Sequence, residues 1–255
     1  KIIITYHADI YSLNPLFILY LPIMLLFLSR SKKIIVTSKA YLNSSLILKF
    51  FRKKVKIIPI GIKKPTFSKN IKKKIMRLKN SNYLIFVGSL RGYKGIKDLI
   101  KASKKLKNGK LVIAGDGPER SKVIKHVNEE EKNNIIFFPK LSNDEKFFLI
   151  NYSRGLVLSS LNRREAFGIV LLEASALKKP LITYELNSGT GFINKNKITG
   201  RVVDLRNTVK LAEVMNLFLY KKQKNYSLNS FKNFSKNFTL KKMILNYEKF
   251  YKNLN

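Results

Sequence analysis

Residues 83–115, YLIFVGSLRGYKGIKDLIKASKKLKNGKLVIAG, decide the fold of this chain. The stretch begins with the apolar run Leu84-Ile-Phe-Val87 and ends with a second run, Leu111-Val-Ile-Ala114. A helical pattern lies between them, from Gly95 to Leu106. Two unbroken apolar runs joined by a helix are typical of a parallel β-α-β unit whose strands are covered on both faces. The stretch therefore predicts an α/β domain.

The same alternation continues toward the C-terminus. Helical patterns and short β-rich runs follow one another at 118–131, 134–139, 144–152, 155–160, 168–177 and 180–184. A helix at 208–220, a polar break and an amphipathic helix around 240–251 complete the pattern. We therefore expect one complete Rossmann-like domain at 83–235.

A second sheet is expected upstream of this domain. The runs Lys33-Ile-Ile-Val-Thr-Ser38 and Val55–Gly61 are predicted strands, and they bracket a helix near 40–51. The Lys-rich stretch 66–82 is the expected linker. Residue 1 is Lys, and no opening strand with a Gly-rich turn is present, so we expect 1–65 to be part of a Rossmann-like domain whose remainder lies upstream.

Two of the 15 acidic residues are the first and last residues of the segment Glu165-Ala-Phe-Gly-Ile-Val-Leu-Leu-Glu173, which is apolar between them. If this whole segment were helical, the carboxylates would be roughly 12 Å apart, which is too far to share one proton transfer. We expect them to contact different parts of one extended ligand. Gly168 permits close backbone approach near the expected helix start, where unpaired N–H groups attract phosphate. A sugar nucleotide offers both hydroxyls and phosphates.

A glycine-rich loop from Gly88 to Gly95 follows the first predicted strand and begins a helix. Such a loop directs backbone N–H groups and a lysine toward an anion, although a glycine-rich turn before a helix is more often structural. The loop and the two glutamates all lie at carboxyl ends of predicted strands, where open α/β sheets bind ligands. Lys94 is therefore the predicted ligand of a diphosphate.

Five ordered motifs resemble the retaining GT-B glycosyltransferases of glycosyltransferase family four. The Glu-x7-Glu segment with the following Ala-Ser-Ala-Leu-Lys-Lys-Pro180-Leu-Ile-Thr is similar to the donor-site helix and next strand of that family. The other four motifs are the loop 87–95, the strand and turn Leu111–Pro118, the loop Thr5-Tyr6-His7-Ala8-Asp9, and Ser188–Gly191 with Thr199–Val203. The last pair resembles bacterial mannosyltransferases that build surface polysaccharides.

The resemblance implies a GT-B fold with two Rossmann-like domains, the N-terminal one incomplete and the C-terminal one complete. It implies that Glu165 contacts the donor hexose, that Glu173 reaches the ribose and that Lys94 holds the diphosphate. His7 would contact the transferred sugar, so the implied catalytic residues are His7, Lys94 and Glu165. The implied donor-binding residues are Gly88, Ser89, Arg91, Lys94, Glu165, Ala166, Phe167, Gly168, Ile169 and Glu173.

One position departs from the family pattern. An arginine normally stands where this chain has Ser89, and Arg91, two residues later, is the candidate substitute. The departure leaves open an inactive transferase that only binds nucleotide sugar. Arg163 and Arg164, beside Glu165, are either solvated or suited to a phosphate or acceptor.

The sequence contains no Asp-x-Asp pair, because its aspartates stand at 9, 98, 116, 144 and 204. This disfavours the metal-dependent GT-A transferases, which chelate a metal on the nucleotide diphosphate, and we expect neither a metal nor a cofactor. Catalysis would be electrostatic, with Lys94 and helix-terminal N–H groups neutralising the leaving group. The chain also lacks cysteine, which excludes disulfides and thiolate metal sites.

The formal net charge of +36 predicts acidic partners. The candidates are anionic substrates, an anionic membrane surface and nucleic acid, and compositional drift toward lysine is the alternative. No RNP-like or helix-turn-helix pattern supports specific nucleic-acid binding. The apolar run Leu16–Leu28 is too short to span a bilayer and contains Pro22, so we expect a buried helix rather than an interfacial one.

These observations predict a hexosyltransferase that moves mannose from a nucleotide sugar to a glycan or lipid-linked acceptor with retention. GDP-mannose is the expected donor and a UDP-sugar the alternative. The expected location is the cytoplasm, including the inner face of the cytoplasmic membrane. The helix 236–255 is expected to pack back on the N-terminal domain. The alternatives are a truncated or inactive transferase and a basic nucleic-acid-binding protein.

Overall fold

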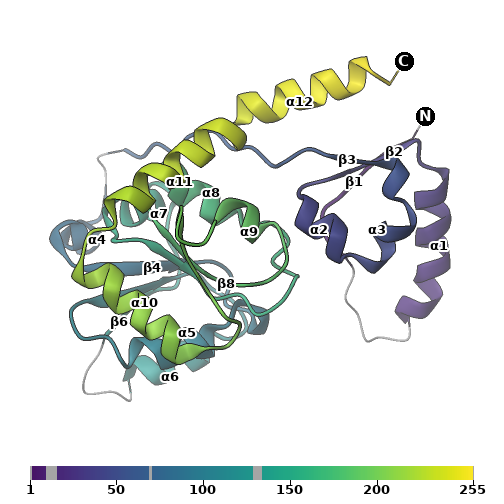
Figure 1. Cartoon of the computed structure of the whole chain (residues 1–255). Helices are drawn as coiled ribbons and strands as arrows, with labels where there is room; N and C mark the ends of the chain where they lie inside the picture. Colours follow the sequence, from purple (N-terminus) through teal and green to yellow (C-terminus); the bar gives the residue numbers. More distant parts are fainter. Residues whose placement is uncertain (1, 10–15, 69–70, 129–133, 255) are drawn as a thin grey trace.

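The computed structural model describes residues 2–9, 16–68, 71–128 and 134–254. Its strands form two parallel sheets, a small one near the N-terminus and a larger one in the middle of the chain (Figure 1). The expected α/β architecture with two Rossmann-like sheets is confirmed.

The small sheet has the order β1-β2-β3, with β1 at Ile3–Tyr6, β2 at Lys33–Val36 and β3 at Val55–Ile57. Its helices are α1 (Leu16–Arg30), α2 (Lys39–Ser44) and α3 (Leu46–Phe50), followed by the 3-10 turn η1 (Arg52–Lys54). The prediction of one helix at 40–51 was wrong, because Ser45 has an extended backbone (φ −81°, ψ 122°). Its Oγ accepts the N–H of Leu48 at 3.3 Å and so starts a second helix.

Helix α1 is only partly buried, unlike the buried helix that we expected. Met24 and Leu28 pack into the small core, whereas Leu19 and Ile23 are 72% and 64% exposed. Within the described residues, no helix combines the length and the apolar character that crossing a membrane requires.

The larger sheet has the order β6-β5-β4-β7-β8-β9. Its strands are β4 (Tyr83–Val87), β5 (Lys110–Ala114), β6 (Ile135–Phe138), β7 (Leu156–Leu158), β8 (Leu181–Tyr184) and β9 (Gly200–Val203). Counted from β4, this is the order 3-2-1-4-5-6 of dinucleotide-binding sheets. The order reverses between β4 and β7, where Ile85 pairs with Leu156. Open sheets of this kind bind ligands outside the carboxyl ends of the strands at that reversal.

Helices cover both faces of the larger sheet (Figure 1). On one face lie α5 (Ile96–Ser103), α6 (Arg120–Asn128) and α10 (Thr208–Tyr220), and on the other lie α7 (Asn143–Tyr152), α8 (Ile169–Ala176) and α11 (Lys224–Asn237). The strands are consequently buried from both sides, and Tyr83 to Phe86 are 0% exposed. This explains why β4 reads as a continuous apolar run rather than an alternating one.

Several elements were not predicted from the sequence. The polar break expected after residue 220 contains α11, which buries Ser230 and Phe234. Within 66–82 the chain forms α4 (Lys73–Met76) and the 3-10 turn η2 (Arg77–Asn80). Ile75 and Leu78 of this segment belong to the core of the larger unit. The remaining short elements are η3 (Gly92–Lys94) and α9 (Thr190–Ile193).

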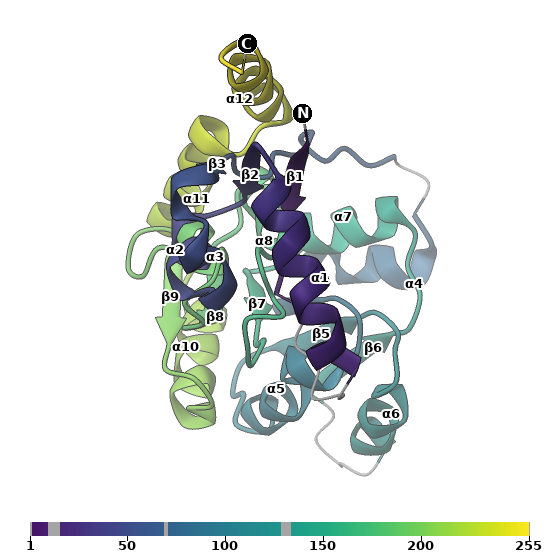
Figure 2. The ribbon, with the colours of Figure 1, turned by 90° about the vertical axis from the view of Figure 1, so that its right-hand side faces the viewer.

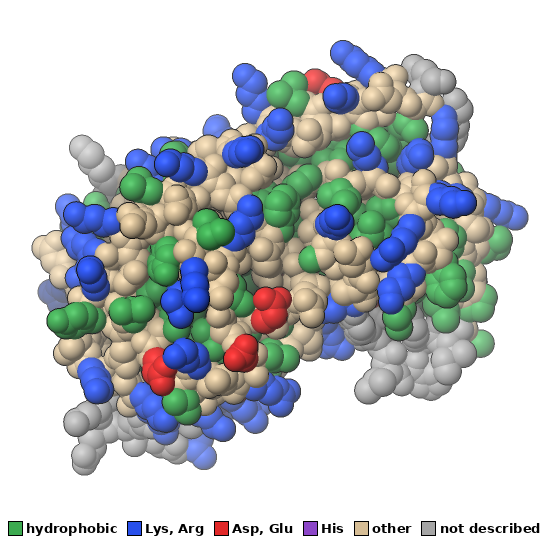
Figure 3. All heavy atoms as spheres, viewed as in Figure 1, with side chains coloured by type: hydrophobic (Ala, Val, Ile, Leu, Met, Phe, Trp, Pro, Cys, Tyr) green, Lys and Arg blue, Asp and Glu red, His purple; other side chains and the backbone are tan. Residues whose placement is uncertain are grey.

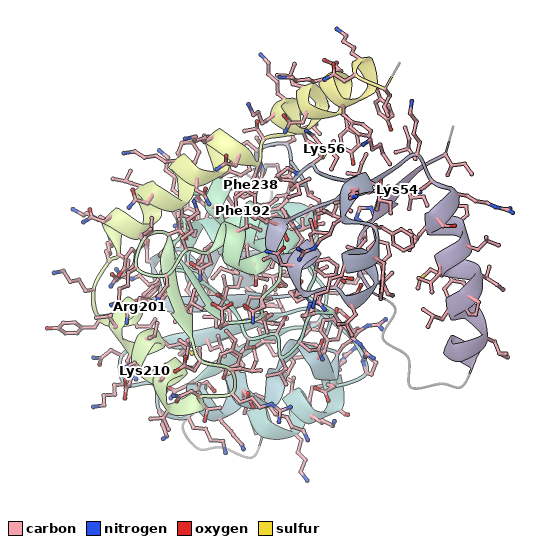
Figure 4. All side chains as sticks on the ribbon, turned by 45° about the vertical axis from the view of Figure 1, so that its right-hand side comes forward. Lys54, Lys56, Phe192, Arg201, Lys210 and Phe238 are labelled. Carbon is pink, nitrogen blue, oxygen red and sulfur yellow. The ribbon has the colours of Figure 1, made fainter. Side chains whose placement is uncertain are left out.

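The chain passes from one unit to the other twice, and the two crossing segments lie side by side. Ile62 and Leu240 are joined through the Ile62 carbonyl, which accepts the Leu240 N–H at 2.9 Å. Beside this pair, a Cβ on Gly61 would lie 2.4 Å from the Thr239 carbonyl oxygen, so the close approach of the two segments requires glycine there. Phe238 is fully buried and packs edge-on against Phe192, at 4.9 Å between ring centroids (Figure 4).

The last helix, α12 (Leu240–Lys252), extends from this crossing to the small sheet. Thr239 caps it by accepting the Lys242 N–H at 3.3 Å. Phe250 packs with Ile35 of β2 and with Ile58. Viewed from the side of the small sheet, the N-terminal unit lies in front of the larger one (Figure 2). The tail and the crossing thus hold the two units against each other.

Candidate functional site

A pocket of about 430 Å³ lies between the two units, at the carboxyl ends of β4 and β7. It therefore occupies the reversal point of the larger sheet. The small unit contributes His7, Ala8 and Thr37 to its wall. The crossing segment and the larger unit contribute Ile60, Val87, Gly88, Lys94, Lys146, Glu165, Ala166, Phe167, Gly168, Ile169, Val170 and Glu173.

The polar centre of the pocket is a buried ion pair between Lys94 and Glu165. Lys94 Nζ lies 2.5 Å from Glu165 Oε2, and the two side chains are 12% and 10% exposed. Ser160, which follows β7, donates its hydroxyl to the same oxygen at 2.7 Å. Lys94 ends the turn η3, so a residue after β4 and residues after β7 meet across the sheet reversal. The pair can present a cation to phosphate and a carboxylate to hydroxyl groups.

Glu165 lies outside the helix, which begins close to Gly168 as expected, so the separation of roughly 12 Å for a fully helical segment does not apply. It lies in the turn before α8, which begins at Ile169. Gly168 precedes this helix with φ +82°, a left-handed conformation that glycine adopts without steric cost. No side chain caps the helix start. Ile169 and Val170 line the pocket, so the first turn of α8 supplies backbone N–H groups that favour an anion.

A second ion pair lies on the other side of this helix start. Lys146 Nζ is 2.7 Å from Glu173 Oε1, and the side chains are 20% and 16% exposed. Lys146 comes from the first turn of α7, whose start is fixed by a capping box between Ser142 and Glu145. Burial raises the pKa of Glu145, but hydrogen bonds from Ser142 and Lys72 outweigh it and hold that pKa below its usual value.

Sequence reasoning missed Lys146. The available signal was its place in the first turn of the helix after β6, at the same sheet edge as Gly88 and Glu165. In a chain with 51 Lys and Arg residues, that position alone did not distinguish one lysine.

The small unit is fixed to the site by Arg163. Its guanidinium pairs with Asp9 at 3.1 Å and lies over the ring of Tyr41, 4.7 Å from the centroid. Asp9 also accepts hydrogen bonds from the hydroxyls of Ser45 at 2.6 Å and Tyr6 at 3.0 Å. Arg163 is therefore an interdomain contact rather than a solvated residue. It holds the loop that carries His7 next to the turn that carries Glu165.

Nine of the predicted site residues line the pocket, and two do not. Ser89 and Arg91 are exposed and are absent from its described lining. The Arg91 N–H bonds to the Ser89 carbonyl at 2.9 Å, which forms a tight turn on the outside of the loop. The suggested replacement of the missing arginine by Arg91 therefore has no support from this geometry.

Residues 67–238 match the family model described as glycosyl transferases group 1. The chain is 33% identical to the O-antigen chain mannosyltransferase C of Escherichia coli, over all of this chain and 69% of that protein. It is 32% identical to the D-rhamnosyltransferase WbpZ of Pseudomonas aeruginosa, over 79% of this chain and 53% of that protein.

Solved structures show the same fold. The crystal structure of Anabaena Alr3699/HepE in complex with UDP aligns with a TM-score of 0.83 and 18% identity, over 99% of this chain and 72% of that one. A glycosyltransferase from Rickettsia africae ESF-5 aligns with a TM-score of 0.76 and 21% identity, over 98% and 70%. The chain therefore has the GT-B fold and belongs to the group 1 glycosyl transferases.

Proposed function

We propose that this chain transfers a hexose, with mannose as the leading candidate, from a nucleotide sugar to a glycan or lipid-linked acceptor. The observation that carries the proposal is the pocket itself, where two Lys–Glu pairs flank the uncapped start of α8. The names of the O-antigen mannosyltransferase and the rhamnosyltransferase support a sugar donor of this kind. GDP-mannose is the proposed donor and a UDP-sugar the alternative.

Each residue of the pocket has a distinct proposed role. Lys94 and the first-turn N–H groups of α8 hold the diphosphate and stabilise the charge that develops on it as the bond to the sugar breaks. Glu165 accepts hydrogen bonds from the hexose, and Glu173 accepts them from the ribose. His7 contacts the sugar from the opposite wall. Lys146 orients Glu173 through their ion pair.

We propose the domain division 1–65, 66–82 and 83–235, with 236–255 returning to the N-terminal unit. Ile75 and Leu78 pack on the larger core, so the segment 66–82 accompanies the donor-binding domain. Retention of the anomeric configuration is proposed from the motif resemblance alone.

We also propose that the protein works at an anionic membrane surface. Lys and Arg side chains are spread over the whole face seen in Figure 3, and the chain carries a net charge of +36. Such a surface attracts anionic lipid.

The proposed donor site can be tested by calorimetric titration of the chain with GDP-mannose and UDP-glucose. We expect saturable binding of one nucleotide sugar to the donor pocket, because the proposed site there has one position for a diphosphate. The variant Lys97→Ala, which removes an exposed lysine of α5 outside the pocket, should bind equally well. A folded sample that gives no heat above free-nucleotide and polyanion controls would refute the donor-site proposal.

A further inference from the structure

A second, more basic pocket lies at the opposite edge of the larger sheet. Its volume is about 660 Å³, and its wall includes Ser81, Arg154 and Pro180, which come just before β4, β7 and β8. It therefore lies at the amino ends of the strands, whereas the donor pocket lies at their carboxyl ends. The end of α7, the connection from α8 to β8 and the start of α11 complete it.

The lining of this pocket is basic. Six of its fifteen lining residues are Lys or Arg and none is Asp or Glu, whereas one residue in five is Lys or Arg in the whole chain. The cations are Lys79, Arg154, Lys178, Lys179, Lys222 and Lys224. Among the residues described by the structure, no carboxylate forms a salt bridge with any of them.

The negative carboxyl ends of helices offset only part of this positive charge. The carboxyl ends of α7, α8 and α10 all lie at the pocket, and each carries roughly half a negative charge. Three such ends offset about one and a half of the six positive charges. The start of α11, which has no side-chain cap, adds positive potential. Neutral acceptors complete the contacts, because Arg154 donates to Asn82 at 2.7 Å and Lys179 to the Ser153 carbonyl at 3.2 Å.

We propose that this pocket binds a compact polyphosphate anion, meaning a ligand with two or three linked phosphate groups, independently of the donor pocket. The cations approach from four separate segments around one concavity, so a ligand with several closely spaced charges can contact most of them at once. The volume is within the usual range for small-ligand sites, about 300–1,000 Å³. A single carboxylate or phosphate would leave most of the positive charge unbalanced.

Anion binding to this pocket should also change the protonation of Lys179. Burial, together with the positive charges of Lys222 and Arg154, lowers the pKa of the Lys179 ammonium to about 8. The other titratable or charged groups that face it in the pocket are Lys79, Tyr152, Lys178 and Lys224. A bound anion favours the protonated form and raises that pKa. Protonation of Lys179 should therefore contribute proton uptake on binding near pH 8 and almost none at pH 6, where Lys179 is already charged; the Lys222→Ala/Lys224→Ala variant should show a smaller contribution.

The test is calorimetric titration of the whole chain with inorganic tripolyphosphate at about 0.15 M salt. The double variant Lys222→Ala/Lys224→Ala removes two exposed cations of the pocket and should weaken binding about tenfold or more. The double variant Lys97→Ala/Lys101→Ala makes the same charge change on α5 and should bind like the original chain. Repeating the titration in buffers of different ionisation enthalpy measures the proton uptake.

The donor-site variant Lys94→Ala separates the two pockets, and it should keep tripolyphosphate binding. Loss of binding in Lys94→Ala, with no loss in the Lys222/Lys224 variant, would place the anion in the donor pocket and overturn the proposal. Equal weakening in the two double variants would also overturn it, because binding would then be diffuse attraction. If the Lys94→Ala variant binds ATP as tightly as it binds tripolyphosphate, the triphosphate is the group that this pocket recognises. Tighter ATP binding would assign the same pocket to a nucleotide.

Discussion

Lys94→Ala is expected to destabilise the folded chain and to remove most of its affinity for a nucleotide sugar. The variant leaves the Glu165 carboxylate buried, with the Ser160 hydroxyl as its remaining described partner. Removing one member of a buried ion pair costs about 3–5 kcal/mol of folding free energy. Urea denaturation at pH 7 measures this loss directly. The double variant Lys94→Ala/Glu165→Gln should recover part of it, because no buried charge is then left unpaired.

The affinity loss follows from the same contact. Truncating one member of a buried charged pair at a binding site costs about 2–5 kcal/mol, so the dissociation constant for the nucleotide sugar should rise at least about 30-fold. Lys97→Ala is the control for a change of net charge. If Lys94→Ala unfolds at the same urea concentration as the original chain and binds the donor unchanged, Lys94 is neither a structural partner of Glu165 nor a diphosphate ligand.

Glu165→Gln is expected to lower turnover, by about 10²–10³-fold, while changing donor affinity little. Its carboxylate is proposed to contact the hexose, whose charge changes in the transition state, so the lost interaction is one that strengthens during reaction. Glu173→Gln is the matched comparison, because it makes the same chemical change in the other Lys–Glu pair of the pocket. It should weaken donor binding about tenfold with little effect on turnover, since the ribose does not change.

Initial rates over a range of donor concentrations, combined with donor affinity from calorimetry, separate these two effects. If both variants lose turnover and affinity in the same proportion, the division of roles between Glu165 and Glu173 is wrong. If both keep the original rates and affinities while remaining folded, the two glutamates are structural.

The strands of the larger sheet could be read from the sequence because burial on both faces makes them continuous apolar runs. The bounds of β4, β5 and β6 agree to within one residue with the predicted runs 84–87, 111–114 and 134–139. Helix α11 was not predicted, because ten of its fourteen residues are Lys, Asn or Ser and the segment therefore resembles a polar loop. The split between α2 and α3 depends on one serine hydroxyl, and a periodicity argument does not detect it.

The site residues that lie in glycine-containing loops could be predicted from the sequence. The residues whose place in the site depends on an ion pair with a distant segment could not. Gly88, Lys94 and Glu165 follow strand ends, so sheet topology brings them together. The partnership of Lys146 with Glu173 and that of Arg163 with Asp9 join distant segments. Spacing along the chain carries no information about such pairs, because many lysines and arginines stand in equivalent positions.

A crystal structure of the chain with bound GDP-mannose, or with whichever donor the titration identifies, tests the central claim most directly. We predict that the diphosphate lies within hydrogen-bond distance, about 3 Å, of Lys94 Nζ and of a first-turn N–H of α8. The hexose should contact Glu165 and the ribose Glu173. A nucleotide sugar bound away from this pocket, with the Lys94–Glu165 and Lys146–Glu173 pairs unchanged and touching no ligand, would contradict the account.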